Sequence, residues 1–264
     1  MTGELTWQIQ HGKTIISFLK YLNSQTKDLI LKGGTALLLC YELDRFSEDI
    51  DLDSRSLEID IEKFVSFFCK KNSYSYRIAK NTNIVKRFMI HYGVVGKPLK
   101  VEISFRRSII PEDDYTNING FIVYTLNSLC ALKSLAYNAR DRIRDLYDLS
   151  FICKRWWDDI SDTSKDIMRG VLQYKGLEQF DYLIQTQPDE LINIKKLADD
   201  FLDMFDKLGL LYDEEEKNML DITKLNLLSL NNDHKENSPQ QNKSTNQDKD
   251  GSLNNVLPPF RPKF

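Results

Sequence analysis

The spacing of hydrophobic and polar residues changes twice along the chain and divides it into three regions. Residues 1–127 mix the three-to-four-residue spacing of amphipathic helices with the every-second-residue spacing of half-buried strands. Residues 128–230 keep only the helical spacing, and residues 231–264 are mostly polar. The pattern predicts an α+β first domain, a helical second domain and a tail.

The hydrophobic spacing also predicts individual elements. In the first region we expect helices near 15–22, 35–43 and 59–68, and strands at 29–31, 49–53, 75–79, 84–92 and 99–105. In the second region we expect helices at 129–136, 143–151, 164–174, 191–208 and 214–228. Gly93 and the stretch 96–98 would turn the chain between the last two strands.

The polar tail has a composition typical of disorder. Residues 231–252 are dominated by Asn, Asp, Lys, Gln and Ser, which bury too little apolar area to offset the chain entropy of ordering. Residues 256–264 are either a short docking peptide or an inert end. We therefore predict a disordered tail over 231–264.

Composition narrows the class of protein. With 264 residues, 41% hydrophobic and 28% charged, the chain is long enough for one generous globular domain or two modest ones. The net charge of −3 argues against a protein that coats nucleic acid with its whole surface, although a local basic patch remains open. The four cysteines form no C-x-x-C pair and lie in apolar stretches, which indicates free buried thiols. We find no signal-peptide core and no membrane span, and expect a cytoplasmic protein.

The central polar feature is a pair of aspartates on a predicted strand. Acids alternate with Ile50 and Leu52, so Asp49 and Asp51 point to one face, with Asp53 following. Two carboxylates this close repel each other unless a cation lies between them, and such oxygen ligands suit Mg²⁺ bound together with substrate phosphates. A lone D-x-D is more often a solvated strand face, so the pair needs partners.

A third carboxylate is available on a later predicted strand. Val101 and Ile103 face one way in the pattern, and Glu102 faces the other. If this strand lies beside the first, Glu102 completes a three-carboxylate site that can hold two metal ions about 4 Å apart. Before the first strand, Gly33 and Gly34 supply a turn without β-carbons, whose N–H groups can cradle a phosphate.

Two motifs in this order resemble the nucleotidyltransferase toxins of the AbiEii/AbiGii type, found in bacterial abortive-infection and toxin–antitoxin systems. The first motif is residues 31–37 (LKGGTAL) followed by 45–52 (RFSEDIDL). The second is 142–149 (RIRDLYDL), which fits the pattern R-x-(K/R)-D-x-x-D-L. Between them, Lys133 matches the family's helix lysine. The motifs cover roughly residues 30 to 150.

The resemblance implies a polymerase-β-like fold. Residues 1–127 would form the nucleotidyltransferase core, a mixed sheet with flanking helices, and 128–230 a helical domain that completes the active site. It implies Asp49 and Asp51 as metal ligands and Glu102 as the third.

The resemblance also assigns roles outside the metal site. Lys133 would contact nucleotide phosphates, and Asp145 would be a further active-site acid. Thr35 stands where family members often have serine, and it keeps a hydroxyl for a phosphate contact. Arg144 stands where lysine is common, which keeps the charge but changes its geometry.

Several of these residues also fit a purely structural interpretation. Lys133 fits a solvated helix position, and Asp141 or Asp145 fits the cap or first turn of a helix that starts near 142. Arg144 and Asp148 lie four residues apart and fit a surface ion pair worth a few tenths of a kcal/mol.

Together these features predict a metal-dependent nucleotidyltransferase that uses a nucleoside triphosphate with Mg²⁺, or Mn²⁺ as an alternative. The resemblance implies an RNA acceptor, tRNA in particular, and an antitoxin partner. A protein side chain or a small molecule such as an antibiotic is an alternative acceptor, and a non-catalytic binding module is a third interpretation. A basic patch for RNA is available in Arg106, Arg107, Lys133, Arg140, Arg142, Arg144, Lys154 and Arg155.

Overall fold

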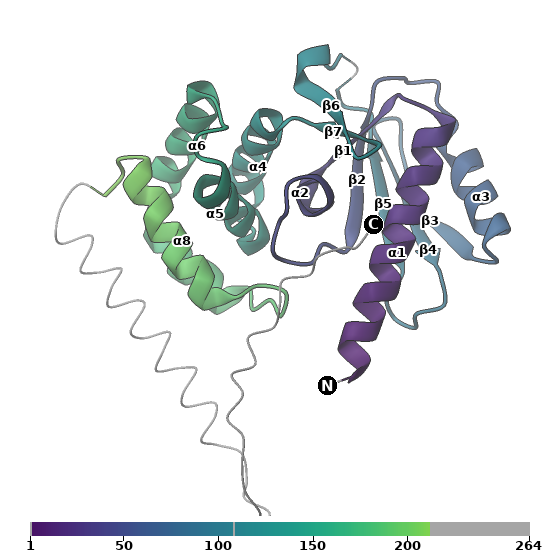
Figure 1. Cartoon of the computed structure of the whole chain (residues 1–264), viewed down its shortest axis with the longest axis horizontal. Coiled ribbons are helices and arrows are strands. Elements are labelled where there is room, and N and C mark those ends of the chain that lie inside the picture. Colours follow the sequence, from purple (N-terminus) through teal and green to yellow (C-terminus); the bar gives the residue numbers. More distant parts are fainter. Residues whose placement is uncertain (1, 108, 212–264) are drawn as a thin grey trace, which may run out of the picture.

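Seven strands form one mixed sheet in the computed structural model, which describes residues 2–107 and 109–211 (Figure 1). Their order is β3-β4-β5-β2-β1-β7-β6, with β2 parallel to β5 and antiparallel to β1. The strands are β1 (Leu29–Lys32), β2 (Asp49–Ser54), β3 (Ser75–Asn81), β4 (Val85–His91), β5 (Leu99–Ser104), β6 (Tyr115–Ile118) and β7 (Phe121–Tyr124). β2 therefore lies at the centre of the sheet, and β3 lies at one edge.

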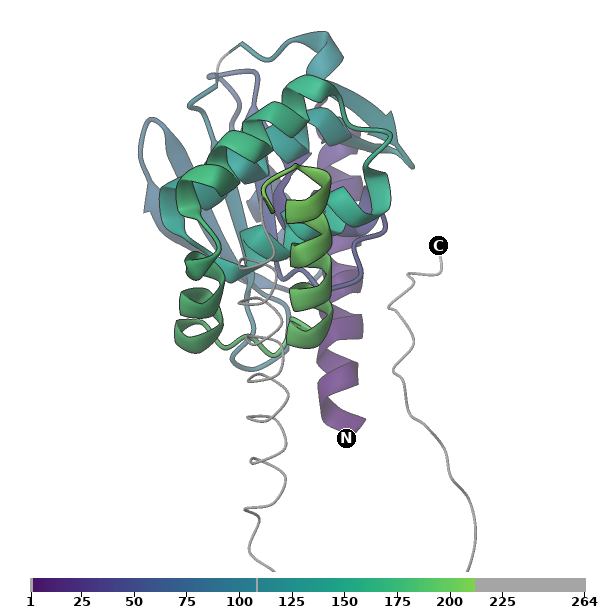
Figure 2. The ribbon, with the colours of Figure 1, turned by 90° about the vertical axis from the view of Figure 1, so that its left-hand side faces the viewer.

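Helices cover the two sides of the sheet unequally. In Figure 1, α1 and α3 lie on one side, and α2 lies on the other with α4, α5, α6 and α8 beyond it. Figure 2 looks from the side of the C-terminal helices and shows them in front of the sheet, with α1 behind. The helices are α1 (Thr2–Gln25), α2 (Gly33–Cys40), α3 (Ile61–Lys71), the short 3₁₀ helix η1 (Glu112–Asp114), α4 (Leu126–Arg140), α5 (Ile143–Trp156), α6 (Asp162–Lys175), α7 (Glu178–Thr186) and α8 (Ile194–Lys207).

The face of the sheet toward α1 and α3 is hydrophobic. Successive strand residues alternate between faces, so Ile50 of β2, Val101 of β5 and Phe88 of β4 share this face, and each is at most 1% exposed. Phe18 of α1 and Phe68 of α3 meet edge-on above them, with ring centroids 4.9 Å apart. This core fixes β2, and it leaves the aspartates of β2 on the opposite face.

Among the described residues, the helices on the opposite face contact mainly β1, β2 and β7. α2 packs on these three strands and on α4, which explains why residues 34–39 are all buried. Three of the C-terminal helices begin with a side-chain cap, because Thr125, Ser161 and Asn193 each accept a hydrogen bond from the backbone N–H three residues later.

The sheet contains both parallel and antiparallel pairs and has helices on both sides. The predicted α+β class with a mixed sheet and flanking helices is therefore confirmed.

The predicted elements of the first region are nearly all present, with one omission. The five predicted strands correspond to β1 to β5, but the hairpin of β6 and β7 was not predicted. Asn119 and Gly120 form its turn with positive φ angles of 53° and 84°, a combination typical of tight hairpins. α7 was also not predicted, and α2 begins at Gly33 instead of Thr35.

Parts of the predicted organisation lie outside the described residues, namely the helix at 214–228 and the tail at 231–264. The division into domains at 127/128 stays a prediction; α4 begins at Leu126, close to it. Among the described residues, no helix is long and apolar enough to cross a membrane. All four cysteines are free and three are buried, as predicted, with Cys40 partly exposed.

Candidate active site

Three of the predicted acids lie together on the open face of the sheet. β2 and β5 are parallel, and their register places Asp51 directly beside Glu102. Asp49 lies two residues before Asp51 and therefore points to the same face. Neighbouring strands are about 4.8 Å apart, so the three carboxylates project from adjacent backbone positions. We expected the three acids to meet if the two strands were neighbours, and the register of β2 and β5 shows that they are.

Basic side chains neutralise these acids. Lys100, the register partner of Asp49, places its ammonium nitrogen 2.5 Å from the Asp49 carboxylate. Arg87 of β4 lies beside Glu102, with its guanidinium 2.5 Å from the Glu102 carboxylate. Both pairs are partly exposed, with 41% of the Asp49 side chain and 25% of the Glu102 side chain accessible. The acids can therefore exchange these partners for others that arrive from solvent.

Asp51 lies between Glu102 on β5 and the turn at Gly33. Burial raises the pKa of Asp51, and the nearby carboxylates of Asp49 and Glu102 add to the effect against the opposing Lys100. Gly33 at the end of β1 has a φ of +77°, and a β-carbon there would lie 3.0 Å from the Asp51 carboxylate. Glycine at this position therefore allows the left-handed turn and also leaves room for the Asp51 carboxylate.

The next acid on β2 has a structural role. Asp53 is 1% exposed and lies 2.5 Å from the ammonium of Lys32. It also accepts a hydrogen bond of 2.8 Å from the hydroxyl of Tyr124 on β7. Asp53 thus links β2 to Lys32 of β1 and to Tyr124 of β7, and both contacts hold its carboxylate within the fold.

Thr35 and Gly34 position the start of β2. Thr35 is 1% exposed; its hydroxyl donates to the backbone carbonyl of Asp49 and lies 2.9 Å from the Ser47 hydroxyl, from which it can accept. A β-carbon on Gly34 would lie 2.9 Å from both the Arg45 guanidinium and the Ser47 hydroxyl. In this structure both residues pack the loop before β2, and the buried Thr35 hydroxyl, for which a phosphate contact was expected, has its partners within that loop.

His11 of α1 holds the same loop from the other side. Its Nε2 lies 2.6 Å from the Glu48 carbonyl oxygen, and its Nδ1 contacts the Tyr92 hydroxyl. Burial lowers the pKa of His11, so the neutral ring donates to Glu48 and accepts from Tyr92. The backbone on either side of the bond between residues 48 and 49 is therefore fixed by two buried side chains.

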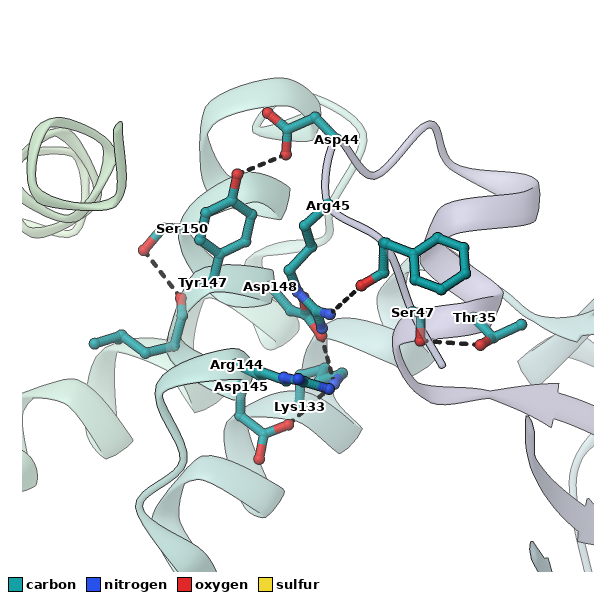
Figure 3. A network of polar contacts seen from close by, with 12 residues as sticks. Thr35, Asp44, Arg45, Ser47, Lys133, Arg144, Asp145, Tyr147, Asp148 and Ser150 are labelled. Atoms are coloured by element: carbon teal, nitrogen blue, oxygen red, sulfur yellow. Dashed lines mark hydrogen bonds and ion pairs between the residues drawn. The ribbon is translucent and has the colours of Figure 1, made fainter. Parts of the chain in front are cut away.

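A buried ionic cluster joins this loop to the helical part (Figure 3). Asp148 of α5, with no exposed side-chain surface, lies 2.6 Å from the Arg45 guanidinium and 2.5 Å from the Lys133 ammonium. Lys133 of α4 also lies 3.0 Å from Asp145, which Arg140 contacts at 2.6 Å. The cluster thus ties α4 and α5 to the segment that carries Asp49.

The charges in this cluster stabilise one another. Burial disfavours the charged form of Lys133, but Asp148 and Asp145 outweigh it and raise the Lys133 pKa. Burial likewise opposes ionisation of Asp145, but Lys133 and Arg140 lower its pKa. Lys133 is 7% exposed, so its interpretation as a solvated helix residue is wrong.

Arg144 lies at the border between the helical part and the sheet. Its guanidinium contacts Glu48 at 3.1 Å and also Asp189, in the segment before α8. The predicted surface ion pair between Arg144 and Asp148 is therefore wrong, since Asp148 faces Lys133 and Arg45. Asp141 ends α4 in a left-handed conformation with φ 45° and does not cap α5.

Two open pockets meet at Arg144. One, of 460 Å³, is lined by Arg140, Arg142, Arg144 and Asp145 together with residues 186–189. The other, of 680 Å³, lies between Trp7, Lys97, Glu48 and the same arginine. Asp51 is close enough to Arg140 to contribute to its raised pKa, after the larger effect of Asp145. The arginine-lined pocket is therefore within electrostatic reach of the acids on β2.

The structure thus brings together most of the predicted site residues, in two groups. Asp49, Asp51 and Glu102 form the first group and Lys133 and Asp145 the second. Sequence reasoning did not assign the cations Lys100, Arg87 and Arg45, whose partners lie 15 to 103 residues away along the chain. The sequence of β5 gave one indication: Lys100 lies two residues before Glu102, so the two side chains point to the same face of the sheet.

The residues present fit a divalent metal in their donor chemistry, since three carboxylates start from neighbouring backbone positions, but their side chains are turned to other partners. Among the described residues, no three His, Cys, Asp or Glu side chains gather closely enough to hold a metal ion as they are placed. Asp49 and Glu102 instead contact Lys100 and Arg87.

Known structures share this arrangement of sheet and helices. The crystal structure of JHP933 from Helicobacter pylori aligns with 81% of this chain and 98% of its own, at 25% identity and a TM-score of 0.63. MenT4, a nucleotidyltransferase toxin from Mycobacterium tuberculosis, aligns over 81% of this chain and 91% of its own, at 18% identity and a TM-score of 0.50. The fold is that of a nucleotidyltransferase. No curated protein matches the chain.

Sequence comparison identifies the family. Residues 18–220 match the family described as "Nucleotidyl transferase AbiEii toxin, Type IV TA system". Since this match spans most of the 264 residues, the chain belongs to the AbiEii nucleotidyltransferase toxin family. The predictions of a nucleotidyltransferase and of a toxin–antitoxin setting are thereby confirmed, and a nucleoside triphosphate substrate and an antitoxin partner follow from the family.

Proposed function

We propose that this protein transfers a nucleoside monophosphate from a nucleoside triphosphate to a hydroxyl group of RNA, tRNA in particular, with Mg²⁺ or Mn²⁺; the new bond joins the hydroxyl oxygen to the α-phosphorus, and pyrophosphate and the hydroxyl proton leave. The observation that carries the proposal is the register of β2 and β5, which places Glu102 beside Asp51 on the face that Asp49 shares. Three carboxylates on one open face are the oxygen-rich set that binds such ions together with phosphates.

In this proposal Asp49, Asp51 and Glu102 hold the metal. When bound, it would neutralise charge on the triphosphate and lower the pKa of the attacking hydroxyl. Lys100 and Arg87 give up their acids at that point and become free to contact substrate oxygens. Catalysis rests chiefly on positioning and on charge neutralisation.

The triphosphate would lie between β2 and the arginine-lined pocket. Arg140 and Arg144 present guanidinium groups there, with 59% and 37% of their side chains exposed, and planar guanidinium groups suit phosphate oxygens. Gly33 makes room for the Asp51 carboxylate, and Gly34 and Thr35 hold the loop that precedes β2. Lys133 is enclosed between two carboxylates, so its contribution in this structure is to hold Asp145 and Asp148.

Incubation with each labelled nucleoside triphosphate in turn, together with total RNA and cell protein, tests the proposal. The wild-type protein should label RNA, chelation of divalent metal should abolish labelling, and Asp51→Asn should not label. The matched control is Glu58→Gln, an exposed acid in the loop after β2, which should label normally. Label only in protein or in a small molecule would overturn the RNA acceptor, and labelling that survives chelation would overturn the metal requirement.

A further inference from the structure

One segment of the chain carries a strongly one-sided charge. Between residues 63 and 101 the sequence contains no aspartate or glutamate, although the whole chain has 39 acids and a net charge of −3. The same segment contains nine basic residues, Lys63, Lys70, Lys71, Arg77, Lys80, Lys86, Arg87, Lys97 and Lys100. It forms most of α3, all of β3 and β4 and the first half of β5. Such segregation of charge indicates a surface for a polyanion.

The strand register sorts these cations between the two faces of the sheet. Lys80 of β3 pairs with Arg87 of β4, Arg87 pairs with Glu102, and Glu102 pairs with Asp51. One row along, Arg77 pairs with Met89, which pairs with Lys100 beside Asp49. Arg77, Lys80 and Arg87 therefore lie on the face that carries the acids, and we call these three residues the basic strip.

The basic strip faces solvent. Arg77 and Lys80 are exposed, and 38% of the Arg87 side chain is accessible. α3 packs against the opposite face, where Tyr76 meets Phe88 and contacts Glu62 of the helix. In Figure 1 the C-terminal helices lie at the far side of α2, away from β3 and β4.

We propose that the basic strip binds the sugar–phosphate backbone of a single-stranded RNA end and leads its terminal hydroxyl to the acids on β2. The proposal rests on the RNA acceptor of the proposed function and adds the surface that receives it. The row from Lys80 to Asp51 crosses four adjacent strands, which is about 14 Å at the usual strand spacing. An acceptor with a negative charge on every nucleotide can follow this row into the site.

The composition of the strip favours contacts with phosphates over contacts with bases. Besides the basic strip, this face of β3 and β4 carries Ser75, Val85, Met89 and His91, without a Phe, Tyr or Trp for a base to stack on. Binding should therefore depend strongly on salt and little on base sequence. An acidic protein segment is the rival occupant, but the direct continuity with Asp51 favours the acceptor itself.

Binding of a labelled single-stranded RNA oligonucleotide to the full chain, without nucleotide or metal, tests the strip. Arg77→Gln combined with Lys80→Gln should weaken binding. Over a series of salt concentrations it should also reduce the slope of log K against log salt by about 1.4, since each lost phosphate contact on single strands contributes about 0.7. The control is Lys70→Gln combined with Lys71→Gln, the same loss of charge on exposed residues of α3, which should leave the slope unchanged.

Each other outcome decides the question. Equal losses in the two double variants would reduce the effect to overall charge and overturn the strip, and an unchanged slope would overturn it as well. Polyglutamate that binds the wild-type protein with the same sensitivity to Arg77 and Lys80 would reassign the surface to an acidic protein. A wild-type protein that binds RNA through the strip but labels none would overturn the proposed function and leave the strip standing.

Discussion

The protein holds two groups of carboxylates that differ in burial and not in chemistry. On the open face, Asp49 pairs with Lys100 at 2.5 Å, and both side chains are more than a quarter exposed. In the cluster between α4 and α5, Asp148 pairs with Lys133 at the same distance, but these side chains are 0% and 8% exposed. Ion pairs on the surface contribute little to stability. Removal of one partner from a buried pair is strongly destabilising, because the other partner keeps a buried charge without a counter-charge. The first group can change partners, and the second holds two parts of the fold together.

The pKa shifts in the two groups run in opposite directions. Burial beside two other carboxylates raises the pKa of Asp51. Asp145 is also buried, but Lys133 and Arg140 lower its pKa. The open face thus holds three acids against two cations, Lys100 and Arg87, whereas the cluster is neutralised by its own lysine and arginines. Sites that bind ligands are typically of the first kind.

The largest expected effect is on catalysis through the open face. Asp51→Asn should reduce nucleotidyl transfer by at least roughly 10³-fold, about 4 kcal/mol in activation free energy, because a ligand carboxylate is lost. The folded state should be as stable as the wild type or more so, since a repulsive charge is removed. Transfer kinetics and denaturant unfolding measured on the same preparation check both halves. An unfolded Asp51→Asn variant would place Asp51 in the structural group.

The buried cluster should show the reverse pattern. Asp148→Ala should lower the free energy of unfolding by about 3–5 kcal/mol, because Arg45 and Lys133 would keep buried charges without this partner. Removing Asp203, which pairs with Lys154 at 3.1 Å on the surface, should cost at most about 1 kcal/mol. Urea unfolding of both variants makes the measurement. Similar losses in the two would remove the distinction between the groups.

The contrast also shows what could be predicted from sequence. The strands that carry Asp51 and Glu102 were predicted because alternation of apolar and acidic residues is a local signal. Their juxtaposition depended on β2 and β5 being neighbours in the right register, which no local pattern predicts. The hairpin of β6 and β7 was missed even though Asn119 and Gly120 carry a recognised local signal.

The buried cluster could not be predicted in the same way. Arg45 and Asp148 are 103 residues apart, and no spacing rule connects a loop before a strand with the middle of a helix. The local rule pointed instead to Arg144 as the partner of Asp148, four residues earlier, because side chains at that spacing share a helix face. Tertiary packing overrode it, since Arg144 faces Glu48 and Asp189.

A smaller effect is expected where a lysine stands among the open acids. Lys100→Met should tighten binding of Mn²⁺ to the nucleotide-free protein by roughly tenfold, about 1.4 kcal/mol, because the ammonium no longer competes for Asp49. It should also lower the stability of the metal-free protein, as three acids lose a counter-charge. Calorimetric titration and thermal unfolding with and without metal test the two effects. The control is Lys86→Met, on the opposite face of the neighbouring strand β4. It should change neither the affinity for Mn²⁺ nor the stabilisation that bound metal gives.

The smallest expected effect is a pH dependence that separates the groups without disturbing the fold. The raised pKa of Asp51 means that the folded state binds a proton on this carboxyl more tightly than the unfolded state does. The contribution of Asp51 to the free energy of unfolding therefore falls as pH rises above the ordinary aspartate pKa and through the raised pKa. The lowered pKa of Asp145 has the opposite sign, because its contribution is present above the ordinary value and is lost as pH falls through the lowered one. Denaturant unfolding of wild type and Asp51→Asn, both with chelator, isolates the first effect. The variant should match the wild type at low pH and exceed it increasingly toward neutral pH. A difference that shrinks with rising pH would mean that Asp51 is already neutralised by Lys100, and the open face would then lack the excess charge that we expect to draw in a metal ion.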